Sequence, residues 1–272
     1  MKGRNGGHFF ATCLSRATGR LIATLAVLVL GAGPSVAADL RVFTSGAPAE
    51  VQKAFAPKFV KSTGDRVLFT IGTLREIREK LSGPEIPDVV VVPAPVMDQL
   101  STAGLLLPGS RIDLARVGIG VVVRAGRRVP DISSAAALRK ALLNARSIVH
   151  PDPRGGGFAG AQIARMFEQL GIADAIKPKI TLMNAITGGV AQIASGATEI
   201  GLFNISEILP VKGVTLAGPL PKDLQSYIVF TGAVHKGSVS PEPAKAYLQS
   251  LSGASARNAW RKGGFETIAG GR

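Results

Sequence analysis

The sequence has almost no cysteine and few aromatic residues. Its 272 residues include one cysteine, Cys13, and only 5% are phenylalanine, tyrosine or tryptophan. Cys13 lies in an N-terminal segment that we expect to be removed, so the mature chain has no thiol for a disulfide, a nucleophile or a metal site. The low aromatic content also argues against a base-stacking surface for nucleic acid. Stability must then come from an ordinary hydrophobic core, for which the length is sufficient.

The sequence also lacks the usual patterns of metal and nucleotide sites. After residue 38 the only histidines are His150 and His235, which do not have the spacing of a metal-binding pair. Residues 155–160 match G-x-G-x-x-G, but residues 152–154 separate them from the preceding strand. The acidic residue expected after the next strand of a dinucleotide site is missing as well. The sequence therefore predicts no metal and no cofactor.

Residues 1–38 have the composition of a secretory signal peptide. Four cations, from Lys2 to Arg20, precede an apolar run at residues 21–30, and small residues at 35–38 offer a cleavage site. The apolar run is too short to span a membrane. We therefore expect a periplasmic protein that is released by cleavage and does not insert into the membrane.

The chain is basic, with a formal net charge of +14, of which the four cations of the presequence account for four. The remaining +10 is spread along the sequence, without a Lys/Arg block or a stripe of interleaved aromatic residues. This distribution argues against nucleic acid as a partner. It is compatible with a generic basic surface or with a small anionic ligand.

From residue 40 onward, the hydrophobic pattern alternates between short strands and helices. Strands are predicted at residues 40–43, 67–70, 88–92, 117–124, 147–150, 180–183, 199–203 and 227–234. Helices are predicted at residues 48–61, 74–81, 96–103, 135–144, 158–170, 189–194, 241–251 and 254–262. Alternation of this kind is typical of α/β folds with parallel strands, in which ligands bind at the carboxyl ends of the strands.

Two of these strands, at residues 117–124 and 227–234, interrupt the alternation. We expect them to cross between two α/β lobes. Lobe 1 would consist of residues 39–119 and 231–272, and lobe 2 of residues 120–230. This arrangement predicts a cleft between the lobes and two hinge crossings, about which the lobes would close on a ligand.

Residues 147–158, SIVHPDPRGGGF, are the most informative stretch. They predict a strand, a loop with two prolines, and three glycines that lead into a helix. The N–H groups of a first helical turn lack partners within the helix, and the helix dipole favours negative charge there. The same design follows the strands that end near residues 43 and 70. The glycines either serve an anion site or merely turn the chain.

The chain resembles the periplasmic solute-binding proteins of ABC importers, in particular the molybdate-binding type and its relatives. The likeness covers essentially the whole mature chain and includes VFTSGA at 42–47, PDVVVV at 87–92, IGVVVRAG at 119–126 and VFTGAV at 229–234. It implies a two-lobed type II periplasmic binding protein fold that captures a small anion. It also implies a monomer that passes its ligand to ABC permease subunits.

The same resemblance implies a set of ligand-binding residues on the loops after the strands. These are Ser45 and Gly46; Thr70, Gly72 and Thr73; Arg154, Gly155 and Gly156; Gly189 and Val190; and Asn204, where the molybdate-binding type has a tyrosine. Neutral donors hold tetrahedral oxyanions in such proteins, whereas a guanidinium such as that of Arg154 suits a planar carboxylate. A molybdate-like oxyanion and a small carboxylate therefore both remain candidate ligands.

An enzymatic alternative exists because part of this subfamily resembles aconitate isomerase, which moves an allylic proton on a tricarboxylate without a cofactor. Arg154 and Arg75 would then bind the carboxylates, and His150 or Asp152 would be the base. Binding without catalysis is the main prediction, since the sequence shows hydrogen-bond donors more clearly than it shows a base.

Overall fold

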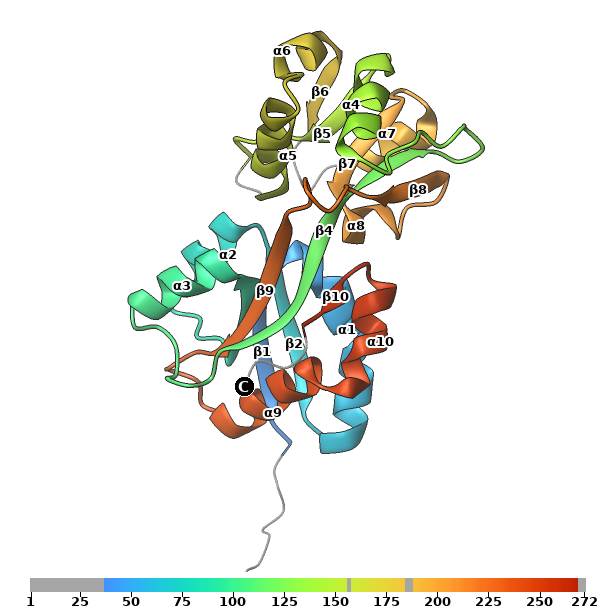
Figure 1. The fold of residues 1–272 in the computed structure, drawn as a ribbon. Helices are drawn as coiled ribbons and strands as arrows, with labels where there is room; N and C mark the ends of the chain where they lie inside the picture. The colour runs from blue at the N-terminus through green and yellow to red at the C-terminus, as the bar shows by residue number, and fades with distance from the viewer. Residues whose placement is uncertain (1–36, 156–157, 184–187, 269–272) are drawn as a thin grey trace, which may run out of the picture. The chain divides into compact units, whose positions relative to one another are not determined.

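The computed structural model describes residues 37–155, 158–183 and 188–268 (Figure 1). The described residues all belong to one compact unit that begins at Ala37. The predicted signal peptide lies outside the described residues, apart from its last two positions, Ala37 and Ala38.

The strands of the described residues form one continuous mixed sheet (Figure 1). They are β1 (Asp39–Ser45), β2 (Arg66–Gly72), β3 (Val89–Pro93), β4 (Ile112–Arg124), β5 (Ile148–Pro151), β6 (Ile180–Met183), β7 (Ile200–Asn204), β8 (Val214–Pro219), β9 (Tyr227–Val234) and β10 (Glu266–Thr267). Their order across the sheet is β2-β1-β3-β9-β4-β7-β5-β6, and β8 and β10 both pair with β4. The α/β fold class predicted from the alternation is confirmed.

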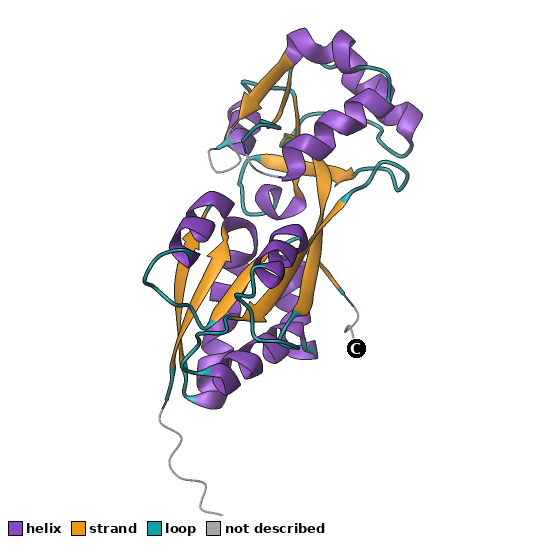
Figure 2. Ribbon diagram, turned by 90° about the vertical axis from the view of Figure 1, so that its left-hand side faces the viewer, coloured by secondary structure: helices purple, strands orange, loops and turns teal. Residues whose placement is uncertain are grey.

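Helices cover both faces of the strands (Figure 2). They are α1 (Gly46–Thr63), α2 (Leu74–Leu81), α3 (Ala94–Thr102), α4 (Ala135–Asn144), α5 (Phe158–Gln169), α6 (Ala173–Ile176), α7 (Gly189–Ser195), α8 (Ile205–Ile208), α9 (Pro241–Ser252) and α10 (Ala254–Lys262), with a 3₁₀ turn at Lys177–Lys179. The sequence pattern missed α6, α8, β8 and β10, which are six residues long or shorter. Elements of this length show no complete hydrophobic period.

Strand β4 is common to both parts of the two-lobed fold. Its first half, Ile112–Gly118, runs antiparallel to β9, and its second half, Ile119–Val123, runs antiparallel to β7. At the changeover, the side-chain amide of Gln225 donates to the carbonyl of Ile119 and accepts from its N–H, both at 2.9 Å. The lobe boundaries at 119/120 and 230/231 stay a prediction.

The hydrophobic core has two large clusters. One packs α1, α9 and α10 against β1, β3 and β9, with Tyr247 and Trp260 fully buried in it. The other packs α4 and α5 against the second half of β4, with Leu138 and Ile163 at its centre. Each half of the sheet therefore has its own hydrophobic support.

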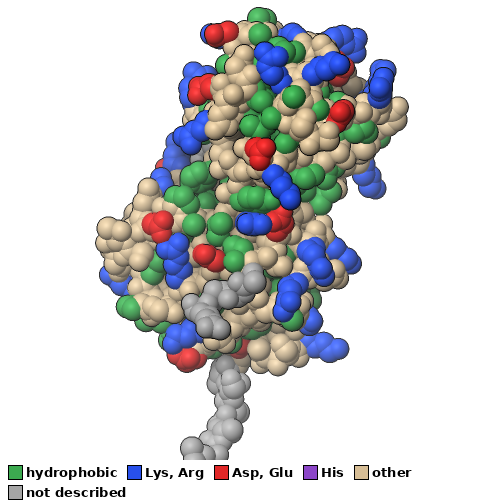
Figure 3. Space-filling view, viewed as in Figure 1, with side chains coloured by type: hydrophobic (Ala, Val, Ile, Leu, Met, Phe, Trp, Pro, Cys, Tyr) green, Lys and Arg blue, Asp and Glu red, His purple; other side chains and the backbone are tan. Residues whose placement is uncertain are grey.

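The surface of the described residues carries scattered charge. On the face shown in Figure 3, lysine and arginine side chains are distributed over the protein and do not gather into one patch. No described helix has both the length and the apolar character that a membrane-spanning helix needs.

Tyr247 places a polar group in the core without a partner. Its ring packs edge to face against Phe59 with centroids 5.1 Å apart, and its hydroxyl is buried without a hydrogen bond among the described residues. The only other tyrosine, Tyr227, is partly exposed, and its hydroxyl bonds to Glu266 at 3.0 Å. The two tyrosines therefore form a matched pair for mutation.

Tyr247→Phe is expected to raise the free energy of unfolding by about 1 kcal/mol, because it removes a buried hydroxyl without a partner and keeps the ring. Tyr227→Phe is expected to lower it by about 0.5 to 1 kcal/mol, because a hydrogen bond is lost. Urea unfolding of both variants measures the difference. A larger loss for Tyr247→Phe than for Tyr227→Phe would contradict this account of the core.

Candidate functional site

A cavity of about 970 Å³ lies where the carboxyl ends of five strands converge. The strands are β1, β2, β3, β5 and β7, and their last residues, which all line the cavity, are Ser45, Gly72, Pro93, Pro151 and Asn204. In α/β folds, ligands bind at this edge of the sheet because the loops and helix starts that follow the strands gather there. The cavity is therefore the candidate binding site.

The start of helix α1 is open toward the cavity. Ser45 precedes the 18-residue helix with an extended backbone, makes no side-chain cap, and is followed by a first turn without an acidic residue. Its hydroxyl oxygen is buried and has no partner among the described residues. An anion could accept hydrogen bonds from this hydroxyl and from the free N–H groups of the first turn.

At the start of helix α2, hydrogen bonds to a residue of the same helix occupy the donors that would face a ligand. Thr73 and Glu76 form a capping box, in which the Thr73 hydroxyl accepts from the Glu76 N–H at 3.2 Å. The Glu76 carboxylate in turn accepts from the Thr73 N–H at 2.7 Å and from its hydroxyl at 3.0 Å. These two bonds hold the pKa of Glu76 below its usual range. A carboxylate of the chain itself thus occupies the donors of Thr73.

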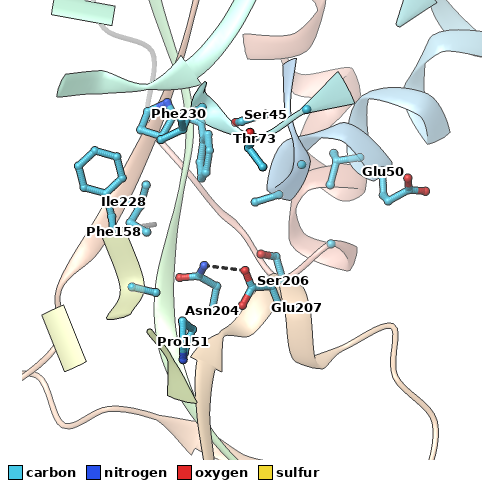
Figure 4. Close-up of a pocket in the computed structure, with 18 of the residues that line it drawn as sticks. Ser45, Glu50, Thr73, Pro151, Phe158, Asn204, Ser206, Glu207, Ile228 and Phe230 are labelled. Atoms are coloured by element: carbon cyan, nitrogen blue, oxygen red, sulfur yellow. Dashed lines mark hydrogen bonds between the residues drawn. The ribbon is translucent and has the colours of Figure 1, made fainter. Parts of the chain in front are cut away.

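Asn204, Ser206 and Glu207 face the cavity from the β7–α8 junction, on the side opposite Ser45 and Thr73 (Figure 4). The Asn204 amide donates to Glu207 Oε1 at 3.1 Å. Three buried oxygen atoms at this junction have no partner among the described residues, namely Asn204 Oδ1, Ser206 Oγ and Glu207 Oε2. Buried polar atoms are normally paired, so unpaired ones around a cavity indicate a place for a polar ligand.

Gly264 holds the junction from the C-terminal side. Its φ of +83° favours glycine, and a Cβ atom there would lie 2.9 Å from the Ser206 nitrogen and 3.0 Å from the Ile205 carbonyl carbon. The loop after α10 therefore packs directly on the backbone that carries Ser206 and Glu207. A side chain at residue 264 would displace one of the two segments.

Burial of the Glu207 carboxyl raises its pKa from the ordinary 4.5 to about 7, although hydrogen bonds from Asn204 oppose the shift. Desolvation penalises the charged form, and no ion pair among the described residues includes Glu207. Near neutral pH this group is therefore divided between its acid and its carboxylate form.

Arg154 lines the cavity but is turned toward its own loop. Its guanidinium contacts the Asp152 carboxylate at 3.3 Å, and its side chain is 83% exposed. Hydrogen bonds from Arg154 hold the pKa of Asp152 below its usual range. Asp152 itself does not line the cavity.

His150 lies in strand β5 and is packed against helix α5. It is buried, its ring packs edge to face on Phe167 with centroids 5.4 Å apart, and Nδ1 lies 2.8 Å from the carbonyl oxygen of Pro151. Burial lowers the pKa of His150, because desolvation disfavours the charged form of the ring. It does not line the cavity.

The remaining wall combines apolar and charged side chains. Phe158, Ile228 and Phe230 belong to its apolar part (Figure 4). The charged groups that line it are Glu50, Arg75, Glu76, Arg154, Glu207 and Lys262. The described residues contain no cluster of histidine, aspartate or glutamate side chains that could hold a metal ion.

The cavity brings together seven of the ligand-binding residues predicted from the sequence. They are Ser45, Gly46, Gly72, Thr73, Arg154, Gly155 and Asn204. Thr70, inside β2, does not line it, and neither do Gly189 and Val190, which are buried at the start of α7. Gly156 lies outside the described residues. The ligand-binding role of all these residues stays a prediction.

Ser206 and Glu207 were not predicted from the sequence. The available signal was the polar sequence that follows the buried strand β7, since such residues fall at the carboxyl end of the sheet. This signal is weak because α8 has only four residues and produces no helical pattern.

Comparison with known proteins decides the family. The family model described as bacterial extracellular solute-binding protein matches residues 40–266. This chain belongs to that family. The solute-binding protein is 28% identical to an aconitate isomerase of Pseudomonas sp. over 254 residues, which cover 90% of this chain and 95% of the isomerase. It is 24% identical to the molybdate-binding protein ModA of Rhodobacter capsulatus over 247 residues, with the same two coverages.

A solved structure supports the fold of this solute-binding protein. The periplasmic molybdate-binding protein of Azotobacter vinelandii superposes with a TM-score of 0.65 at 22% identity, covering 83% of this chain and 98% of the other. The two-lobed type II periplasmic binding protein fold expected from the sequence is thereby confirmed.

The pKa of Glu207 makes stability depend on pH. Above pH 4.5 the unfolded chain loses this proton, while the folded protein keeps it up to about pH 7, so folding becomes less favourable across this interval. Glu207→Gln cannot ionise. We therefore expect the stability difference between Glu207→Gln and the wild type to change by roughly 3 kcal/mol, in favour of the variant, between pH 4 and pH 8. Urea unfolding of both proteins at both pH values measures this change. An equal difference at both pH values would contradict the shift.

Proposed function

We propose that this solute-binding protein captures a small anion in the cavity and delivers it to an ABC permease from the periplasm. The observation that carries this proposal is the set of buried oxygens without partners around the cavity, above all Ser45 Oγ at the open start of α1. A hydroxyl can donate to an anionic oxygen, and a long helix directs its positive end to the same place.

Several further observations support the proposal. The molybdate-binding relative gives a precedent for anion binding within a chain of similar length. The basic presequence with its apolar run supports export. The cavity volume falls in the range of about 300 to 1,000 Å³ that is usual for small-molecule sites. Its apolar wall leaves room for an anion with a carbon skeleton as well as for an oxyanion.

The first experiment measures which anions bind. Thermal unfolding of the mature protein is recorded with molybdate, sulfate, citrate and cis-aconitate, since a ligand at 100 times its dissociation constant adds about 2.7 kcal/mol to stability. Calorimetry with the best anion then tests Ser45→Ala. We expect about 5- to 100-fold weaker binding, because a hydrogen bond to the anion is lost.

Ser101→Ala is the matched control. Ser101 is exposed on α3 and does not line the cavity, so its substitution should leave the affinity unchanged. If Ser45→Ala binds the anion as tightly as Ser101→Ala does, the open start of α1 does not form the site.

A second candidate function is the isomerisation of an unsaturated tricarboxylate, which is favoured by the identity to the aconitate isomerase. A carboxylate would take a proton from one allylic carbon, the double bond would shift, and a proton would return to the far carbon, with no oxidant or reductant. Neither His150 nor Asp152 lines the cavity, so Glu207 is better placed than either to act as the base.

This second function is tested by NMR with cis-aconitate in deuterated water. An isomerase would produce the trans isomer with deuterium incorporated, and Glu207→Gln would abolish both changes. Protein that binds cis-aconitate for hours without exchange or isomerisation would exclude the enzymatic function and leave anion binding intact.

A further inference from the structure

Glu207 presents a contradiction in a site for anions. Its carboxyl group lines the cavity, with Oε1 accepting from Asn204 and Oε2 buried without a partner. As a carboxylate, it would place a negative charge next to the ligand and leave Oε2 without a donor. As a carboxylic acid, it would carry its proton on Oε2, because Oε1 already accepts a hydrogen bond.

The charged neighbours do not neutralise Glu207. On α1, Glu50 pairs with Lys53 at 2.9 Å, and on α2, Arg75 lies 3.8 Å from Glu79. Arg154, in the loop before α5, pairs with Asp152. The other two charged groups that line the cavity are Glu76, engaged by Thr73, and Lys262, in the last turn of α10. None of these groups forms an ion pair with Glu207.

We infer that Glu207 recognises the bound anion as a neutral carboxylic acid, donating the Oε2–H to an anionic oxygen of the ligand. This inference rests on the anion-binding function proposed above and assigns the specificity-determining contact within it. Ser45 and Ser206 contribute neutral hydroxyl donors to the same cavity, so the acid adds a third neutral donor. The ligand class is an anion whose oxygen can accept this bond, a carboxylate or an oxyanion.

A direct consequence is that ligand and proton bind together. In the free protein the carboxyl titrates near neutral pH, since burial raises its pKa to about 7. An anion beside Oε2 disfavours the charged form further. At pH 8 the free protein has mostly lost this proton, so binding must restore it. Affinity should then fall about 10-fold for each pH unit above 8.

Calorimetry at pH 8 in two buffers of different ionisation enthalpy measures the proton uptake. Molybdate and cis-aconitate serve as probes, because they represent the two anion classes. We expect an uptake of about 0.9 proton per anion bound by the wild type. Glu207→Gln keeps the shape and a donor but cannot titrate. Its uptake should be near zero and its dissociation constant flat between pH 7 and 9, apart from any titration of the probe itself.

Glu168→Gln is the matched control, since Glu168 is exposed on α5 and does not line the cavity. It should retain the wild-type proton uptake. Wild-type uptake no greater than that of Glu207→Gln would overturn the inference and leave anion binding standing. If Glu207→Gln does not fold, zero uptake by the wild type overturns the inference by itself. If the wild type binds none of the four anions of the thermal panel, the proposed function and this inference are overturned together.

Discussion

The structure depends on one strand that serves two half-sheets. Strand β4 runs for 13 residues and changes partner from β9 to β7 near Ile119. Its hydrogen bonds therefore fix the register of both parts at once, and the paired bonds between Gln225 and Ile119 hold the changeover. Each half of the sheet is packed by a separate hydrophobic cluster. The cavity forms where the strand ends of the two halves face each other.

Much of the fold could be predicted from local pattern. Continuous apolar runs such as β3 and β7 are buried on both faces, and the alternation of strand and helix implied parallel pairing. The strand predicted at residues 227–234 coincides with β9, whereas β4 begins five residues before its predicted start at residue 117. The early part of β4 contains the charged residues Asp113 and Arg116, so this part of the strand is not a continuous apolar run.

The site was only partly predictable, because the end of a buried strand is visible in the sequence, whereas the other strand ends that share its cavity are not. The residues that follow β1 and β2 could be placed at the cavity, since small polar residues after a buried strand are visible in the sequence. The Thr73–Glu76 capping box and the Asp152–Arg154 contact join residues two or three positions apart, so both are local features of the sequence. That Glu207 lies in the same cavity as Ser45 and Thr73 depends on the fold, which brings the end of β7 opposite the ends of β1 and β2.

The capping box at the start of α2 bears on how a ligand leaves. An anion that takes the N–H of Thr73 must replace the carboxylate of Glu76, so the number of hydrogen bonds at Thr73 is the same before and after the exchange. Such an exchange contributes little net affinity. When the anion leaves, the carboxylate of Glu76, three residues along the same helix, can replace it as the acceptor of the Thr73 hydrogen bonds. Water is then not needed to satisfy these donors. A carrier that must unload its cargo gains from having this replacement within its own helix.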